Sequence, residues 1–60
     1  MPDYKLLLLA KDLRARAKEV LAQVESMKDA NARQEMREIA ADYERLAERL
    51  ERHARYANKV

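Results

Sequence analysis

Two regular stripes of apolar residues run along this chain of 60 residues, and they are out of phase with each other. Steps of four and three residues alternate along the first stripe, which consists of Leu6, Ala10, Leu13, Ala17, Val20, Val24 and Met27. The second stripe repeats this alternation and consists of Ala32, Met36, Ile39, Tyr43, Leu46, Leu50, His53 and Ala57, with His53 its one polar member. Such alternation is typical of helices that bury one side. The step from Met27 to Ala32 is five residues, so a continuous helix would swing its apolar stripe by about 100° there.

A turn between the two stripes removes this conflict, and the local residues suit one. Asp29 is a candidate N-cap, because its carboxylate can accept from the free backbone N–H groups of a new helix. Asn31 is a competing cap, with Gln34 in the capping-box position. Lys28 suits the negative C-terminal end of the first helix. These residues favour a connection at residues 29–30 over one uninterrupted helix.

The patterns together predict an all-α fold, an antiparallel helical hairpin with helices over residues 4–28 and 30–57. The whole chain, 1–60, forms one domain, and Asp3 caps the first helix. Composition agrees, because Gly is absent and helix-forming residues dominate. The alternative is a single long helix in a coiled coil.

So short a chain needs stabilisation beyond one hairpin. Cysteine is absent, which excludes disulfides, so oligomerisation, or unusually good helix packing, is the expected source of stability. Further apolar residues lie beside the two stripes: Leu7, Leu9, Leu21, Ala40, Ala47 and Ala54. An isolated hairpin would leave these flanks in water, whereas a homodimeric four-helix bundle would bury them. We therefore expect self-association through these residues; a helix of a different protein, or ordinary solvated surface, are the alternatives.

The charges also favour pairing of two copies. Residues 1–18 carry a net charge of +3, residues 52–60 carry +3, and residues 19–51 carry −4. In a hairpin, the two basic segments meet at the open end and the acidic segment forms the loop end. Two hairpins packed head to tail would place opposite charges together; the alternative is a solvated surface with local pairs.

Signatures of catalysis and of metal or cofactor binding are missing from the sequence. Carboxylate-bridged metal bundles use a Glu three residues before a His, and Leu50 holds that position before His53. Ser26 lies at the turn, far from His53, and no Gly-rich loop exists to hold a phosphate. We therefore expect a protein that is not an enzyme and that binds no cofactor.

Nucleic acid is the partner that we weigh against self-association. Candidate polyanion contacts at the open end are Lys11, Arg14, Lys18, Arg52, Arg55 and Lys59, with Tyr4 and Tyr56 as stacking groups. Backbone-directed binding needs only such a basic surface. However, acids along the rest of the rod would repel a long duplex, and the net charge is only +2. A solvated surface is therefore favoured.

A membrane partner has less support. The longest apolar run, residues 6–10, is too short for a signal-peptide core or a membrane span. The segment KLLLLAKDLRARAK could form an amphipathic surface helix, but its stripe already has a partner in the second helix. We expect a cytoplasmic protein.

The segment MKDANARQEMREIAADYERLAERLE resembles short, uncharacterised helical-hairpin proteins that are numerous in alphaproteobacteria of the soil. The matching positions are Ala22, Asp29, Arg33, Ile39, Ala40, Tyr43, Leu46 and Ala47; Ala30 departs from the Pro often found there. That family has no assigned activity, so the resemblance implies a fold and no function.

The hairpin plan is also similar to Rop, a small bundle that binds paired RNA loops through an exposed Phe on its first helix. This chain has no Phe, so the similarity is one of architecture. The predicted function is a non-enzymatic, self-associating helical-hairpin module for protein–protein interaction. The alternative is Rop-like RNA binding through the basic open end.

Overall fold

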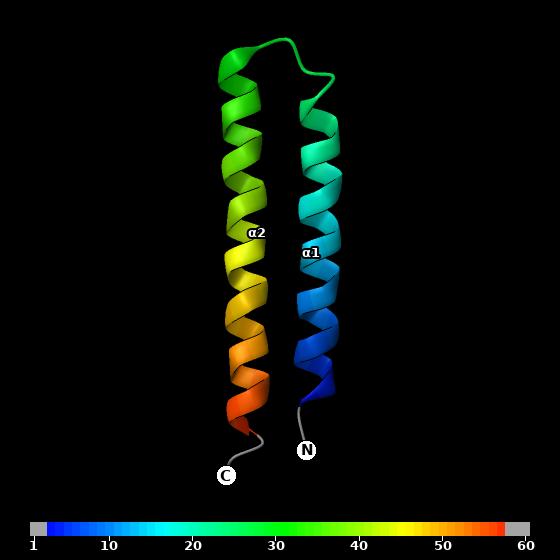
Figure 1. Ribbon diagram of the computed structural model, residues 1–60, viewed down its shortest axis with the longest axis vertical. Helices are drawn as coiled ribbons and strands as arrows, with labels where there is room; N and C mark the ends of the chain where they lie inside the picture. The colour runs from blue at the N-terminus through cyan, green and yellow to red at the C-terminus, as the bar shows by residue number, and fades with distance from the viewer. Residues whose placement is uncertain (1–2, 58–60) are drawn as a thin grey trace.

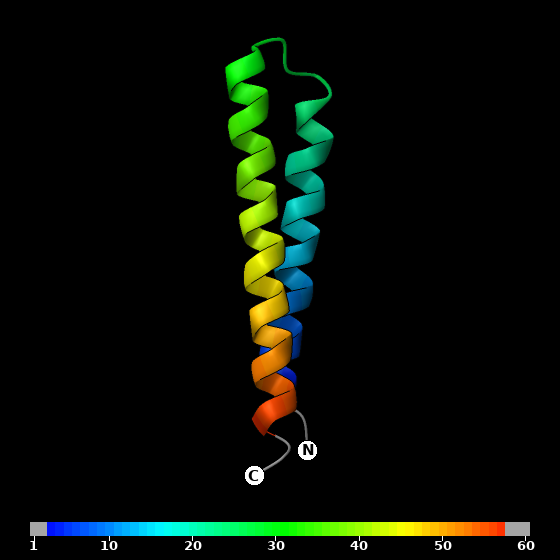
Figure 2. The same cartoon turned by 60° about the vertical axis from the view of Figure 1, so that its left-hand side comes forward.

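The computed structural model describes residues 3–57, which form two antiparallel α-helices joined by a short connection (Figure 1). Helix α1 spans Tyr4–Val24 and helix α2 spans Ala30–Ala57. The turned view in Figure 2 shows the two helices side by side and slightly inclined to each other. The start of α1 and the end of α2 lie together at what we call the open end, opposite the connection at the loop end (Figure 1). The predicted all-α hairpin is confirmed.

Helix α1 begins at the predicted cap. The carboxylate of Asp3 accepts from the backbone N–H groups of Lys5 at 3.1 Å and Leu6 at 3.4 Å. The Asp3 carbonyl accepts from the Leu7 N–H at 3.1 Å, which closes the first helical turn. A cap of this kind stabilises a helix by about 1 kcal/mol.

Helix α1 ends earlier than predicted, at Val24 instead of residue 28. The Ser26 hydroxyl donates to the Gln23 carbonyl at 2.9 Å, and the Ser26 N–H donates to the same oxygen at 3.1 Å. The Met27 N–H donates to the Val24 carbonyl at 3.1 Å. These bonds to residues three positions back tighten the last turn and close the helix. Ser26 assists because its short polar side chain competes for backbone groups and so weakens the helix.

Helix α2 begins at the predicted cap, Asp29. Its carboxylate accepts from the Asn31 N–H at 3.0 Å, and its carbonyl accepts from the Arg33 N–H at 3.0 Å. The competing capping box does not form, because the Gln34 side-chain amide donates to the Glu38 carboxylate at 3.4 Å instead. The connection therefore places its cap where the phase of the two stripes requires a break.

Small residues form the contact between the helices. The buried apolar side chains of the described residues are Ala10, Ala17, Val24, Ala40, Ala47 and Ala54, each at most 4% exposed. On each helix these residues recur every seven positions, so they form one straight column per helix. Alanine columns allow two helix backbones to approach closely.

This contact corrects part of the prediction for α2. On α1, Ala10, Ala17 and Val24 of the predicted stripe are buried, and its other members are half-buried. On α2, however, Ile39 is 42% exposed, Leu46 is 45% exposed and His53 is also exposed. Each of these three directly precedes a buried alanine, so each lies about 100° around the helix from the contact. The predicted flank of Ala40, Ala47 and Ala54 is thus the inner side of α2, because the smallest side chains permit the closest helix approach.

The hairpin is one layer thick. Its Cα atoms extend over 49 × 14 × 9 Å. Protein domains are normally built from at least two packed layers around a core of large apolar side chains. In this hairpin the larger apolar side chains lie beside the contact, where a second layer could cover them.

Candidate interaction surface

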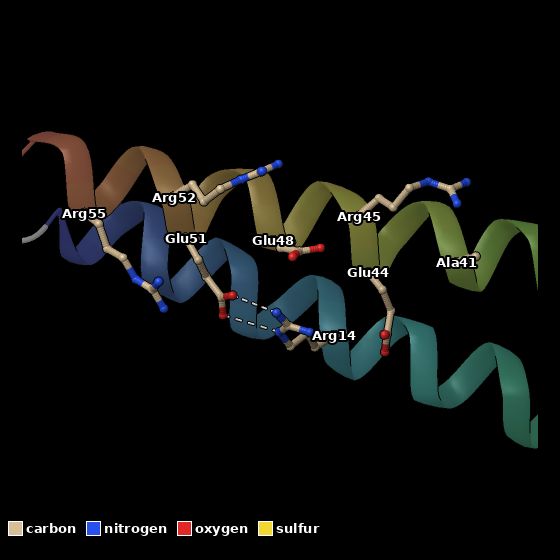
Figure 3. Close-up of a pocket in the computed structure, with 8 residues that line it drawn as sticks. All are labelled: Arg14, Ala41, Glu44, Arg45, Glu48, Glu51, Arg52 and Arg55. Carbon is tan, nitrogen blue, oxygen red and sulfur yellow. Dashed lines mark hydrogen bonds and ion pairs between the residues drawn. The ribbon is translucent and has the colours of Figure 1, made fainter.

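An ion pair between the helices shows how their sides are arranged. The Arg14 guanidinium donates from Nη2 to Glu51 Oε1 at 2.7 Å and from Nε to Glu51 Oε2 at 3.3 Å (Figure 3). Both side chains are half-buried. The hydrogen bond from Arg14 lowers the pKa of the Glu51 carboxyl, and the same bond raises the pKa of Arg14. Paired donors and acceptors of this kind fix orientation as well as adding energy.

This pair assigns the sides of each helix to the two faces of the hairpin. In an α-helix, residues i+3 and i+4 lie on opposite sides of residue i. Arg14 and Glu51 each follow a buried alanine by four residues, and they bond to each other, so the i+4 sides share one face. The i+3 sides, which carry Leu13 and Leu50, must therefore share the opposite face.

The i+3 side is an apolar surface that we call the apolar face. It consists of Leu6, Leu9, Leu13, Val20, Met36, Ile39, Tyr43, Leu46 and Leu50. Leu9, Ile39 and Leu46 belong to it because each precedes a buried alanine by one residue, which places it on the same side as i+3. These three are exposed and the other six are half-buried. Arg16, Gln23 and His53 also directly precede buried residues, so three polar side chains interrupt this side. The large apolar side chains of both helices thus meet water on one side of the molecule.

The i+4 side has a different character, and we call it the charged face. It consists of Leu7, Arg14, Leu21, Arg37, Glu44 and Glu51. An open groove of about 620 Å³ runs beside it and is lined by Arg14, Ala41, Glu44, Arg45, Glu48, Glu51, Arg52 and Arg55. Figure 3 shows Glu44 and Glu51 directed toward α1, whereas Arg45 and Arg52 point away from it. Acids and bases are therefore mixed along this face, and the Arg14–Glu51 pair links its two helices.

The structure divides the predicted interface residues into three groups. Leu9 lies on the apolar face, whereas Leu7 and Leu21 lie on the charged face. Leu21 shares a small hollow there with Arg37 and Glu44. The alanine column of α2 is enclosed within the hairpin, which is a correction: Ala40, Ala47 and Ala54 are at most 2% exposed.

The predicted polyanion contacts do not form one basic patch within the described residues. Arg14 is paired with Glu51, and Arg52 and Arg55 share their groove with three glutamates. Lys11 and Lys18 are exposed on α1, and Lys59 lies outside the described residues.

Sequence reasoning assigned several residues of the apolar face to the hairpin's own core. Leu13, Val20, Tyr43 and Leu50 are only half-buried, so they remain available to a second layer. The signal that separates them from the inner contact is the alanine at every seventh position of α2. That column is visible in the sequence, and the prediction treats it as a flank of the stripe instead of the inner contact.

Other kinds of site have little support within residues 3–57. No helix there is long and apolar enough to cross a membrane, and no three His, Cys, Asp or Glu side chains gather in that part of the chain to hold a metal ion. Comparison with protein-family models, curated proteins and solved structures finds no match to this chain.

Proposed function

We propose that the protein is a non-enzymatic interaction module that self-associates through its apolar face into a homodimeric four-helix bundle. One observation carries this proposal. The buried apolar side chains of the described residues are five alanines and one valine, while the leucines, isoleucine and tyrosine of the apolar face remain partly in water. Burial of a Leu or Ile side chain stabilises a fold by about 1.5–3 kcal/mol, so a second layer has much to add.

The exposed area supports a dimer. The chain exposes 5047 Å². A compact monomer of 7.1 kDa exposes about 4,100 Å², so the hairpin exposes roughly 1,000 Å² more than expected. A compact protein of twice this mass exposes about 6,800 Å². Two separate hairpins expose twice 5047 Å². The excess over the compact protein is about 3,300 Å², which is the area that two copies would bury between them and is typical of obligate homodimers.

Nucleic-acid binding through the open end has weaker support. The Arg14–Glu51 pair removes one of the candidate cations, and Glu44, Glu48 and Glu51 line the groove that holds the arginines. Carboxylates at these positions repel phosphates, so the observations favour the apolar face as the functional surface.

A pair of matched variants tests the proposal. Leu46 and Leu21 are almost equally exposed, at 45% and 44%, but lie on opposite faces. Leu46→Glu should abolish the dimer, because it places a charge in the centre of the proposed interface. Leu21→Glu should leave the dimer intact. Light scattering gives the mass of each variant, and circular dichroism reports its helix content. A dimer that survives Leu46→Glu, or that Leu21→Glu disrupts equally, would refute the proposal.

A further inference from the structure

The charges along the edges of the apolar face point to one arrangement of the two copies. Asp42 and Arg49 lie three residues after Ile39 and Leu46, and so farther round the same side of α2. Glu35 lies in the same column, before both of them. The corresponding column on α1 consists of Lys5, Asp12 and Glu19. All six are exposed. They flank the proposed interface, where charges select the orientation of a partner.

Four of these six edge charges have no ion-pair partner within residues 3–57. Asp12 is bonded to Arg16 and Asp42 to Arg45 within their own helices. The remaining four are Lys5, Glu19, Glu35 and Arg49. On α1 the base, Lys5, lies at the open end and the acid, Glu19, toward the loop end. On α2 the acid, Glu35, lies toward the loop end and the base, Arg49, toward the open end.

Both edges therefore have the same polarity, acidic toward the loop and basic toward the open end. Two copies with their loops at the same end would place like charges beside each other, which is unfavourable. Two copies with their loops at opposite ends would place unlike charges beside each other. The net charges of the segments agree, since 19–51 carries −4 and the two terminal segments carry +3 each.

The heights of the four residues also match in this second arrangement. A two-fold axis that joins the same face of both copies and puts their loops at opposite ends places α1 beside the partner's α1 and α2 beside the partner's α2. On α1, Lys5 lies one residue after the start and Glu19 five residues before the end, so with the helix ends aligned the two differ in height by four residues, or about 6 Å. On α2, Glu35 lies five residues after the start and Arg49 eight residues before the end, a difference of three residues, or about 4.5 Å. Long side chains span such offsets, and each copy supplies both halves of each contact.

We propose that the second copy packs head to tail, with its loop beside the open end of the first, with Glu19 near the partner's Lys5 and with Glu35 near the partner's Arg49. This inference rests on the proposed self-association. It specifies the occupant of the apolar face as another copy of this chain, and it predicts that the two loops lie at opposite ends of the bundle.

A distance between spin labels tests the orientation. The chain has no cysteine, so Ser26→Cys introduces a single labelling site at the loop. Head-to-tail packing predicts a distance between the two labels that approaches the 49 Å length of the hairpin. Packing with both loops at one end predicts about 20 Å, the width of two helices with their side chains. Glu44→Cys, at mid-rod, is the matched control, because its label distance should be similar in both arrangements.

The outcomes separate the two proposals. A monomer in light scattering would overturn self-association itself. A dimer with a short Ser26→Cys distance would overturn only the head-to-tail orientation.

A charge exchange gives an independent readout of the same contact. Glu19→Lys should weaken the dimer roughly two- to tenfold at low salt, and adding Lys5→Glu should restore it. In the opposite orientation Glu19→Lys would relieve repulsion and strengthen the dimer, which would contradict the inference.

Discussion

The apolar face and the charged face flank the same alanine contact, yet they differ in what they leave unsatisfied. On the charged face, Arg14 and Glu51 bond to each other across the helices, and the remaining charged groups are open to water. On the apolar face, large side chains such as Leu46 and Ile39 have neither a buried environment nor a polar group to hydrate. Exposure alone therefore does not identify an interface. Leu21 and Leu46 are equally exposed, and only their neighbours distinguish them.

The largest expected difference between the faces comes from removing a leucine from each. Leu13 and Leu7 are both half-buried on α1, on the apolar and the charged face respectively. Leu13→Ala should destabilise the protein by about 2–5 kcal/mol per chain, because the dimer buries this side chain completely. Leu7→Ala should cost about 1 kcal/mol, since its side chain stays partly in water. Chemical unfolding at one protein concentration measures both, and equal losses would contradict the assignment of the faces.

An intermediate change in stability is expected at the alanine contact between the two helices. Ala17 is fully buried between the helices, whereas Ala41 is exposed beside the charged face. Ala17→Leu should reduce stability by about 1–3 kcal/mol, because a larger side chain forces the helices apart. Ala41→Leu should have little effect. Thermal unfolding distinguishes them, and an unchanged midpoint for Ala17→Leu would show that the helices do not meet at their alanine columns.

The smallest effect is expected from the ion pair on the charged face. The pKa of Glu51 is lower in the folded protein than in the unfolded chain, because Arg14 donates to its carboxylate. The pair therefore stabilises the fold above the ordinary glutamate pKa, and this stabilisation is lost as pH falls through the lowered value. Glu51→Gln should lack this component, so its unfolding midpoint should fall less than that of the natural protein between about pH 7 and about pH 3. Parallel pH profiles would show that the pair contributes nothing.

Much of the hairpin could be predicted from the sequence, because helix phase and capping are local properties. The five-residue step from Met27 to Ala32 located the turn, and Asp29 and Asp3 supplied the caps that the structure contains. The end of α1 was harder to predict from the sequence. It depends on the hydroxyl of Ser26 bonding to a carbonyl, a bond that competes with continued helix.

The rotation of α2 about its axis was the main feature that pattern reasoning missed. Three adjacent columns of α2 are largely apolar, and they contain Ile39, Ala40 and Tyr43. The Tyr43 column forms a regular stripe with either of the other two, so periodicity alone does not select the column that meets α1. Close approach of the backbones favours the column with the smallest side chains. The candidate interaction surface follows from that choice, because it turns the larger side chains toward one face.

If a second copy covers the apolar face, the mass of the natural protein in solution should reveal it. Light scattering across a dilution series should give twice 7.1 kDa at high concentration. Helix content measured on the same samples should fall as the dimer dissociates, because the alanine contact alone buries little apolar surface. A fully helical species of 7.1 kDa at every concentration would contradict the account, since the hairpin would then be stable with its apolar face in water.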